Sequence, residues 1–243
     1  MQIGILNTRP ISGGLIPVTF RLLRLIPGLL LYGIADAFMI RAALGVAPWT
    51  VFSQGLSLHT PLSIGILTNI IGLCVLLLWI PLRQRPGIGT VCNILLVGPG
   101  IDLGLWLLPT PETLWARIAF FTAGLLLLAV ASGIYIGARL GPGPRDGLMT
   151  GLHQRFGIPI WLGRTGVELT VLVIGWFLGG NVGLGTVAFA LLIGPLCGFT
   201  LPLFDAELRR ERRAARAAGD GSGSDPLTRE RPATPTGEIT LPA

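Results

Sequence analysis

Lysine is absent from this sequence, and charged residues of every kind are scarce. Only 12% of the 243 residues are charged, whereas 51% are apolar and the mean hydropathy is +0.72. A soluble domain carries roughly a quarter charged residues, so this is the composition of an integral membrane protein. The pI near 10.5 does not indicate nucleic-acid binding, because no soluble basic domain is present to carry it out.

Several catalytic and cofactor-binding patterns are also missing. The sequence has no Walker A motif and no GxSxG, and His59 and His153 are not part of an HExxH motif. Cys74, Cys92 and Cys197 lie in apolar runs without CxxC spacing, which is typical of small buried apolar residues. We therefore expect no enzyme, no catalytic residue, no metal and no cofactor.

Six apolar segments are long enough to cross the hydrocarbon core of a membrane, which takes about 20 residues. Between the first and second segments, and between the fourth and fifth, Gly- and Pro-marked stretches predict short helices at 50–58 and 146–155. We expect Thr50 and Asp146, each two residues after a proline, to be their N-caps. The six segments are 22–43, 62–82, 88–108, 117–139, 160–178 and 184–204.

The chain contains an internal repeat. Residues 44–99 align without a gap with residues 140–195, and 18 of the 56 positions are identical. This indicates a duplicated three-helix unit. Three crossings are an odd number, so the predicted fold is all-α and integral to the membrane, with six transmembrane helices in a 3+3 inverted-topology repeat. Identical residues expected to shape the scaffold include Pro48, Gly89, Gly98 and Pro99 in the first copy and Pro144, Gly185, Gly194 and Pro195 in the second.

The arginines predict the orientation of the chain. With a cytoplasmic N-terminus, sixteen arginines lie inside and only Arg41 and Arg117 lie outside. Both termini are therefore expected in the cytoplasm. The predicted organisation is a cytoplasmic segment at 1–21, repeats at 22–108 and 117–204, a basic juxtamembrane helix at 205–218 and a disordered tail at 219–243.

The Gly98–Pro99 and Gly194–Pro195 pairs fall in the middle of the third helix of each repeat. Proline removes a backbone donor and clashes with the preceding turn, so both helices are expected to kink or break near mid-membrane. Paired broken helices mark central sites in transporters. Simple packing kinks are the alternative.

Three motifs carry a family resemblance: LGVAPWT at 44–50, GIGT at 87–90 and LGPGPRDGLM at 140–149. Arg164 and Glu168, one helical turn apart, fit the same pattern. Over residues 22–203 the chain resembles the bacterial YczE/YyaS/YitT group of integral membrane proteins, YczE-type members most closely. The resemblance implies a multi-pass protein of the bacterial inner (plasma) membrane and implies no established activity.

Charged residues that occur in only one copy of the repeat are the functional candidates, because ionisable groups inside a membrane are costly. Arg164 and Glu168 share one helix face, as an internal ion pair or as a substrate or proton site. An arginine beside a helix N-terminus would attract anions. The deepest acids would relay protons, bind a cation or pair with an arginine. The candidates are Arg145, Asp146, Arg164 and Glu168 in the second copy and Asp36 and Asp102 in the first.

These patterns predict a secondary transporter or permease for a small anionic or zwitterionic solute, with its site between the repeats. The alternative is a non-transporting accessory or regulatory membrane protein that acts through protein partners. The expected partners are the lipid bilayer and a solute, without nucleic acid. The solute, the coupling ion and the choice between a homodimer and another membrane-protein partner stay open.

Overall fold

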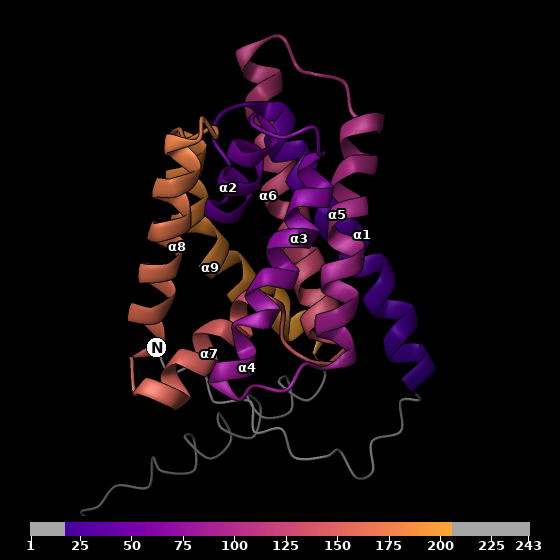
Figure 1. Cartoon of the computed structure of the whole chain (residues 1–243). Helices are drawn as coiled ribbons and strands as arrows, with labels where there is room; N and C mark the ends of the chain where they lie inside the picture. The colour runs from indigo at the N-terminus through magenta and orange to yellow at the C-terminus, as the bar shows by residue number, and fades with distance from the viewer. Residues whose placement is uncertain (1–17, 206–243) are drawn as a thin grey trace, which may run out of the picture. The chain divides into compact units, whose positions relative to one another are not determined.

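The computed structural model describes residues 18–205, and every regular element in this range is an α-helix (Figure 1). Six spans in it are long and apolar enough to cross a membrane, which confirms the all-helical prediction for the described residues. The predicted basic helix after residue 205, the tail at 219–243 and residues 1–17 lie outside them. The helices are α1 (Val18–Ala42), α2 (Pro48–Ser57), α3 (Ile64–Leu77), α4 (Trp79–Leu82), α5 (Ile88–Leu107), α6 (Leu114–Ile136), α7 (Pro144–Phe156), α8 (Ile160–Phe177) and α9 (Leu184–Phe204).

The second membrane span is divided, whereas the sequence predicted one helix at 62–82. α3 ends at Leu77 and α4 begins at Trp79. Pro81 has no backbone N–H, so it cannot donate the helical hydrogen bond to Leu77 O, and this explains a boundary here. Arg83 then adopts a left-handed conformation with φ of 55° and ends α4.

Both short helices start two residues earlier than the sequence predicted. Pro48 and Pro144 are the first residues of α2 and α7, and the N-caps are Ala47 and Gly143. The prediction of Thr50 and Asp146 as N-caps is therefore wrong. A proline fits the first helical position because its missing N–H would lack a partner there and its φ is already helical.

α1 is the central helix, because it packs on α5 along one side and on α6 along another. Glycines let the backbones approach on both sides, as expected where small residues meet between membrane helices. A Cβ at Gly33 of α1 would overlap backbone atoms of α5, and one at Gly124 of α6 would lie 2.9 Å from Ala35 O. The core is built around α1, with Leu29, Ala35 and Met39 fully buried.

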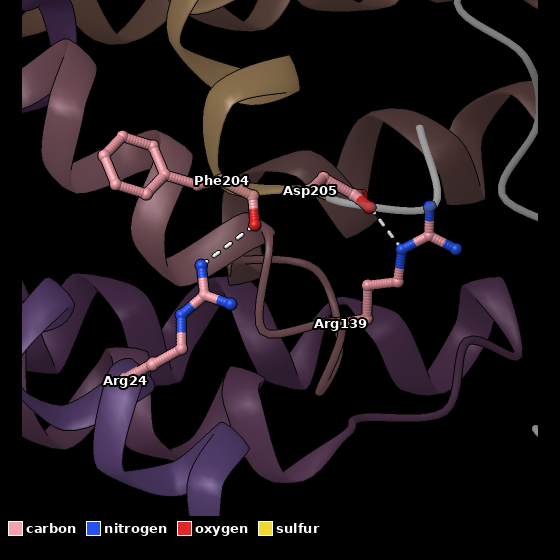
Figure 2. A network of polar contacts seen from close by, with 4 residues as sticks. All are labelled: Arg24, Arg139, Phe204 and Asp205. Atoms are coloured by element: carbon pink, nitrogen blue, oxygen red, sulfur yellow. Dashed lines mark hydrogen bonds and ion pairs between the residues drawn. The ribbon is translucent and has the colours of Figure 1, made fainter. Parts of the chain in front are cut away.

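The C-terminal end of α9 is fixed by two arginines (Figure 2). Arg24 Nη2 on α1 donates to Phe204 O at 2.9 Å, and Arg139 Nε pairs with Asp205 Oδ2 at 2.9 Å. Cations at a helix C-terminus satisfy its last carbonyl groups and balance their partial negative charge. The end of α9 is thereby held to α1 and to the residues that follow α6.

α8 and α9 stand apart from one another. α8 packs on α2 and α7, α9 packs on α6, and the two helices diverge from the loop that joins them (Figure 1). Only 11% of the α8 span and 6% of the α9 span are buried, against 39% for the span of α3 and α4 and 44% for α5. The first three spans and α6 thus form a packed bundle, and the last two spans are largely exposed.

Candidate functional site

Two loops, one before α2 and one before α7, each close on the start of a helix from the other half of the chain. Leu44 O accepts a hydrogen bond from Gly185 N at 2.7 Å, and Leu140 O accepts one from Gly89 N at 2.8 Å. A Cβ at either glycine would press on the backbone of the opposing loop. Leu44 and Leu140 are aligned positions in the repeat, as are Gly89 and Gly185. The same contact is therefore made twice, in opposite directions.

Trp49 and Arg145 meet between these loops. They directly follow Pro48 and Pro144 and are aligned positions in the repeat. The Arg145 guanidinium carbon lies 5.0 Å from the centre of the Trp49 ring, which is a cation–π contact. The boundary between the two halves therefore carries a positive charge held by an aromatic ring.

Asp36 lies close to this boundary on α1. Its side chain is 2% exposed, and the charge that acts on it comes from Arg145. Its carboxyl group also faces the hydroxyl of Thr50 on α2. Arg41, which lies on α1 one helical turn and more after Asp36 and could also have paired with it, instead donates to Thr110 Oγ1 at 2.8 Å. Of the partners that the sequence left open, Arg145 is the one brought to Asp36.

Asp146 lies on α7 next to Arg145. Tyr135 donates its hydroxyl to Asp146 Oδ2 at 3.3 Å. The carboxyl is exposed on one side, yet the surrounding helices remove enough solvent to raise the pKa of Asp146, and Arg164, Tyr135 and Arg145 oppose that rise. Asp146 therefore links the charge on α7 to the charge on α8.

Arg164 and Glu168 form the ion pair that their spacing predicted. Arg164 Nε lies 3.0 Å from Glu168 Oε1, and the two side chains are 51% and 31% exposed. Arg164 also acts electrostatically on Asp146 and on Tyr32 of α1. Both side chains are partly exposed on α8, and Arg164 is the member of the pair that acts on Asp146.

Two tyrosines belong to the same group and were missed by the sequence analysis. Tyr32 and Tyr135 meet edge to face with ring centroids 6.1 Å apart. Both are surrounded by protein, and both lie within reach of the charge of Asp146. They are the only tyrosines in the chain. That scarcity, together with the i, i+4 spacing of Tyr32 and Asp36, was the available signal.

Asp102 is placed elsewhere and has a structural role. Its carboxylate accepts hydrogen bonds from Ser63 Oγ at 2.6 Å and from Gly65 N at 3.0 Å, so it holds the first turn of α3 against α5. It pairs with none of the arginines of the group around Asp146. The structure thus gives five of the six charged candidates a common location and separates the sixth.

The two Gly-Pro pairs do not break their helices. α5 runs without interruption past Gly98 and Pro99, and α9 does the same past Gly194 and Pro195. In α5, Asn69 of α3 supports this position by accepting a hydrogen bond from Gly98 N at 3.0 Å. In α9, nothing lies within 4 Å of a Cβ placed at Gly194. Of the predicted kink or break, the break is therefore wrong, and only the first pair is enclosed by a neighbouring helix.

The chemistry that this group offers is charge and hydrogen bonding. Between residues 18 and 205, no three His, Cys, Asp or Glu side chains are arranged to hold a metal ion. Three carboxyl groups, two guanidinium groups and two phenol groups converge from α1, α6, α7 and α8: Asp36, Asp146, Glu168, Arg145, Arg164, Tyr32 and Tyr135. We name this set the charged cluster.

Comparison with known proteins identifies the family. Residues 19–202 match a family of unknown function, DUF6198. An uncharacterized protein of Haemophilus influenzae is 41% identical over 169 residues, covering 70% of this chain and 78% of the relative. The uncharacterized membrane protein YczE of Bacillus subtilis is 36% identical over 181 residues, covering 72% and 84%.

A more distant relative, the uncharacterized protein YyaS of Bacillus subtilis, is 25% identical over 192 residues, covering 76% of this chain and 94% of the relative. No solved structure matches the chain significantly. Since the family match covers most of the described residues and YczE is 36% identical over 72% of this chain, the resemblance noted from the motifs is confirmed. The chain is a YczE-type member of the DUF6198 family of membrane proteins.

Proposed function

We propose that this protein is a secondary transporter or permease for a small solute, which binds at the charged cluster between the two halves of the chain. The observation that carries the proposal is the convergence of five ionisable side chains from α1, α7 and α8 inside a bundle of apolar helices. Such groups are costly in a membrane and mark substrate or ion paths.

The proposed architecture is a 3+3 inverted repeat, and the reciprocal loop contacts support it. A further pair of contacts obeys the same relation. Trp79 of α4 covers Gly147 of α7, and Gly175 of α8 lies against the backbone of Val51 of α2. The aligned partners of Trp79 and Gly147 are Gly175 and Val51. A two-fold relation between inverted halves predicts such exchanged contacts, and in transporters the site lies at that boundary.

The orientation we propose follows from the arginines. The N- and C-termini lie in the cytoplasm of a bacterial cell, and the protein crosses the plasma membrane six times. The start of α8 and the whole of α7 then lie on the cytoplasmic side. The Arg164 and Glu168 side chains, which are 51% and 31% exposed, would then be reached from the cytoplasmic side.

The solute class follows from the two arginines. Arg145 stands on α7 over the Trp49 ring, and Arg164 projects from the open side of α8. Guanidinium groups bind carboxylate and phosphate oxygens through paired hydrogen bonds. The acids beside them would hold an ammonium group. We therefore propose an anionic or zwitterionic solute.

Uptake into proteoliposomes tests the proposal. The full-length protein would be reconstituted and screened with radiolabelled amino acids, short carboxylates and inorganic phosphate, with and without a pH gradient. Arg145→Ala and Glu168→Gln should abolish uptake of the active solute. Glu112→Gln is the matched control, because Glu112 is exposed in the loop before α6 and lies outside the charged cluster.

Size-exclusion profiles and melting temperatures of each variant show that the protein is still folded. Uptake that survives both cluster substitutions would overturn the proposed site. If the folded wild-type protein moves no solute across the screen and copurifies with a stable membrane partner, the accessory or regulatory function replaces the transporter.

A further inference from the structure

We propose that Asp36 and Thr50 form a proton-binding site, at which Asp36 takes up the proton that accompanies an anionic solute. The inference rests on the proposed function for its role in transport. The site itself is defined by geometry in the part of the chain that the structure describes. It names the coupling ion, which the charge pattern of the sequence left open.

The Asp36 carboxyl is enclosed, and one of its oxygens has no hydrogen-bond partner. Asp36 is 2% exposed and Thr50 is 1% exposed. Within residues 18–205, neither Asp36 Oδ1 nor Thr50 Oγ1 has a hydrogen-bond partner, although the two groups face each other. A buried ionised carboxylate needs donors or a close counter-charge. The Thr50 hydroxyl offers a single donor, which is less than an enclosed carboxylate needs. A proton on Asp36 removes the buried charge, and the acid O–H can then donate to the Thr50 hydroxyl.

A proton fits this site better than a metal cation does. Na⁺ or a divalent ion would need several oxygen ligands, whereas a proton needs one oxygen to hold it and one to accept its hydrogen bond. The enclosed oxygens are those of Asp36 and Thr50.

The titratable and charged side chains on the helices that surround Asp36 come from four elements. Arg145 on α7 provides the opposing charge, and Tyr32 lies one turn earlier on α1. From α6, Tyr135 is occupied as the donor to Asp146. From α5, Asp102 is occupied by Ser63 and Gly65 of the α3 start. When Asp36 gains or loses a proton, Arg145 is therefore the charged group whose electrostatic interaction changes directly.

The aligned position in the second half carries the same two groups in exchanged places. Asp36 and Thr50 of the first half align with Ser132 and Asp146 of the second. The acid lies on the membrane helix in one half and on the short helix in the other. Asp146, however, has a donor in Tyr135 and lies near Arg164. Asp36 Oδ1 is the enclosed carboxyl oxygen left without a hydrogen-bond partner in the described residues, which makes Asp36 the group that binds the proton.

Protonation of Asp36 would make room for an anion. With every group ionised, Asp36, Asp146 and Glu168 carry three negative charges against the two positive charges of Arg145 and Arg164. The step is Asp36–COO⁻ plus H⁺ giving Asp36–COOH, with no other bond formed or broken. It removes the negative charge that competes for Arg145, so the guanidinium over the Trp49 ring can bind a solute carboxylate or phosphate. Proton and monovalent anion together leave the net charge of the cluster unchanged.

Infrared difference spectroscopy on the full-length protein in lipid vesicles tests the site directly, using the proton itself as the ligand. The wild-type protein should show a C=O stretching band of a protonated carboxyl that disappears as the pH is raised and shifts in D₂O. Asp36→Asn should abolish this band. Asp102→Asn should keep it, because the Asp102 carboxylate accepts from Ser63 and Gly65 at the start of α3 and is not part of the proposed site.

A second variant keeps the test decisive if Asp36→Asn fails to fold. Thr50→Val leaves Asp36 in place and removes the hydroxyl, so the band should move to higher frequency as the acid loses its acceptor. The inference is overturned if the wild-type protein shows no such band, if the band persists in Asp36→Asn, or if it keeps its position in Thr50→Val. A band removed by Na⁺ at fixed pH would assign a cation to the site instead of a proton.

The spectrum requires no flux, so the two proposals fail separately. A band from Asp36 in a protein that moves no solute would keep the proton site and reject the transporter. Solute uptake that depends on a pH gradient and keeps that dependence in Asp36→Asn would keep the transporter and reject the proton site.

Discussion

The pair α3–α5 and the pair α8–α9 occupy aligned positions in the sequence and yet differ in packing. α3 lies on α5 through Gly65, Gly98 and Asn69, whereas α8 and α9 leave their facing sides open. The closed pair uses Asp102 to hold two helices together, while the open pair carries Arg164 and Glu168. The two aligned helix pairs therefore differ in one respect. The pair with the structural acid Asp102 is closely packed, whereas the pair that carries Arg164 and Glu168, which align with uncharged residues in the first half, is not.

On the proposed function, this difference describes one of two conformations. Inverted-repeat transporters expose a central site to one side at a time by moving one half against the other. Here the α3–α5 pair is the closed one. Four comparisons of variants, ordered from the largest expected effect to the smallest, test this distinction between the packed and the exposed parts of the molecule.

Gly98→Ala should destabilise the protein, whereas Gly194→Ala should not. A Cβ at Gly98 would overlap Asn69 Oδ1 and Gly65 O, and overpacking of this kind costs about 1–3 kcal/mol. At Gly194 nothing lies within 4 Å, so the gain in helix propensity, about 1 kcal/mol at most, should dominate. Unfolding of both variants in mixed micelles measures the difference. Equal losses would show that α8 and α9 close on each other in the membrane.

Asp102→Asn should cost more stability than Glu168→Gln. An amide oxygen can replace only part of what the Asp102 carboxylate offers to Ser63 and Gly65, and a donor left unpaired costs about 1–3 kcal/mol. The pair of Arg164 and Glu168 is exposed and spaced i, i+4, for which about 0.3–0.5 kcal/mol is usual. The same unfolding assay gives both values, and the reverse order would remove the distinction between a structural acid and an exposed one.

Cysteines at aligned positions should report the opening itself. In a background without the three native cysteines, Arg164→Cys should react with a water-soluble maleimide several-fold faster than Thr68→Cys, because thiol reactivity follows exposure. The Arg164 side chain is 51% exposed, whereas Thr68 is 6% exposed and donates to Ile64 O at 2.9 Å. Labelling rates in detergent micelles, where the reagent reaches both sides of the protein, give the comparison. Similar rates would mean that the aligned positions share one environment.

Asp146→Asn should flatten the dependence of stability on pH by a small amount. Because the pKa of Asp146 is raised in the fold, the native protein holds this proton more tightly than the unfolded chain does. Its contribution is fully present below the ordinary carboxyl pKa of about 3.9 and is lost as the pH rises through the raised value. Melting temperatures from acid to neutral pH should fall less in Asp146→Asn than in the wild type, with Glu112→Gln as the control. An identical fall in both proteins would contradict the raised pKa.

The membrane helices and the repeat were predictable from sequence because their signals are local or periodic. Runs of about 20 apolar residues define spans directly, and a fixed offset exposes a duplication. The helix starts at Pro48 and Pro144 were mislocated because a hydroxyl or acid two residues later also fits an N-cap. The continuous α5 was not foreseen, since Asn69, the residue that supports Gly98, lies on a different helix.

The charged candidates were selected by asymmetry between the copies, and this criterion cannot show which charges meet. Asp102 passed it, yet Ser63 and Gly65 occupy its carboxylate, and no sequence pattern links residues so far apart. Trp49 was known only as the counterpart of Arg145, and its contact with that arginine depends on how the halves are arranged. Tyr32 and Tyr135 carry no charge at neutral pH and so escaped a search for charges.

The paired hydrogen bonds at Leu44 and Leu140 have a consequence for how the protein is made. The loop that ends at α2 emerges from the ribosome early, but the donor for Leu44 O is Gly185, at the start of the last membrane helix. The first half therefore inserts into the bilayer before the hydrogen bond to Leu44 O can form. That bond forms only after Gly185 has been synthesised, near the end of translation. Each half serves as the assembly template of the other, so we expect the two halves expressed as separate chains to be degraded alone and to accumulate only together.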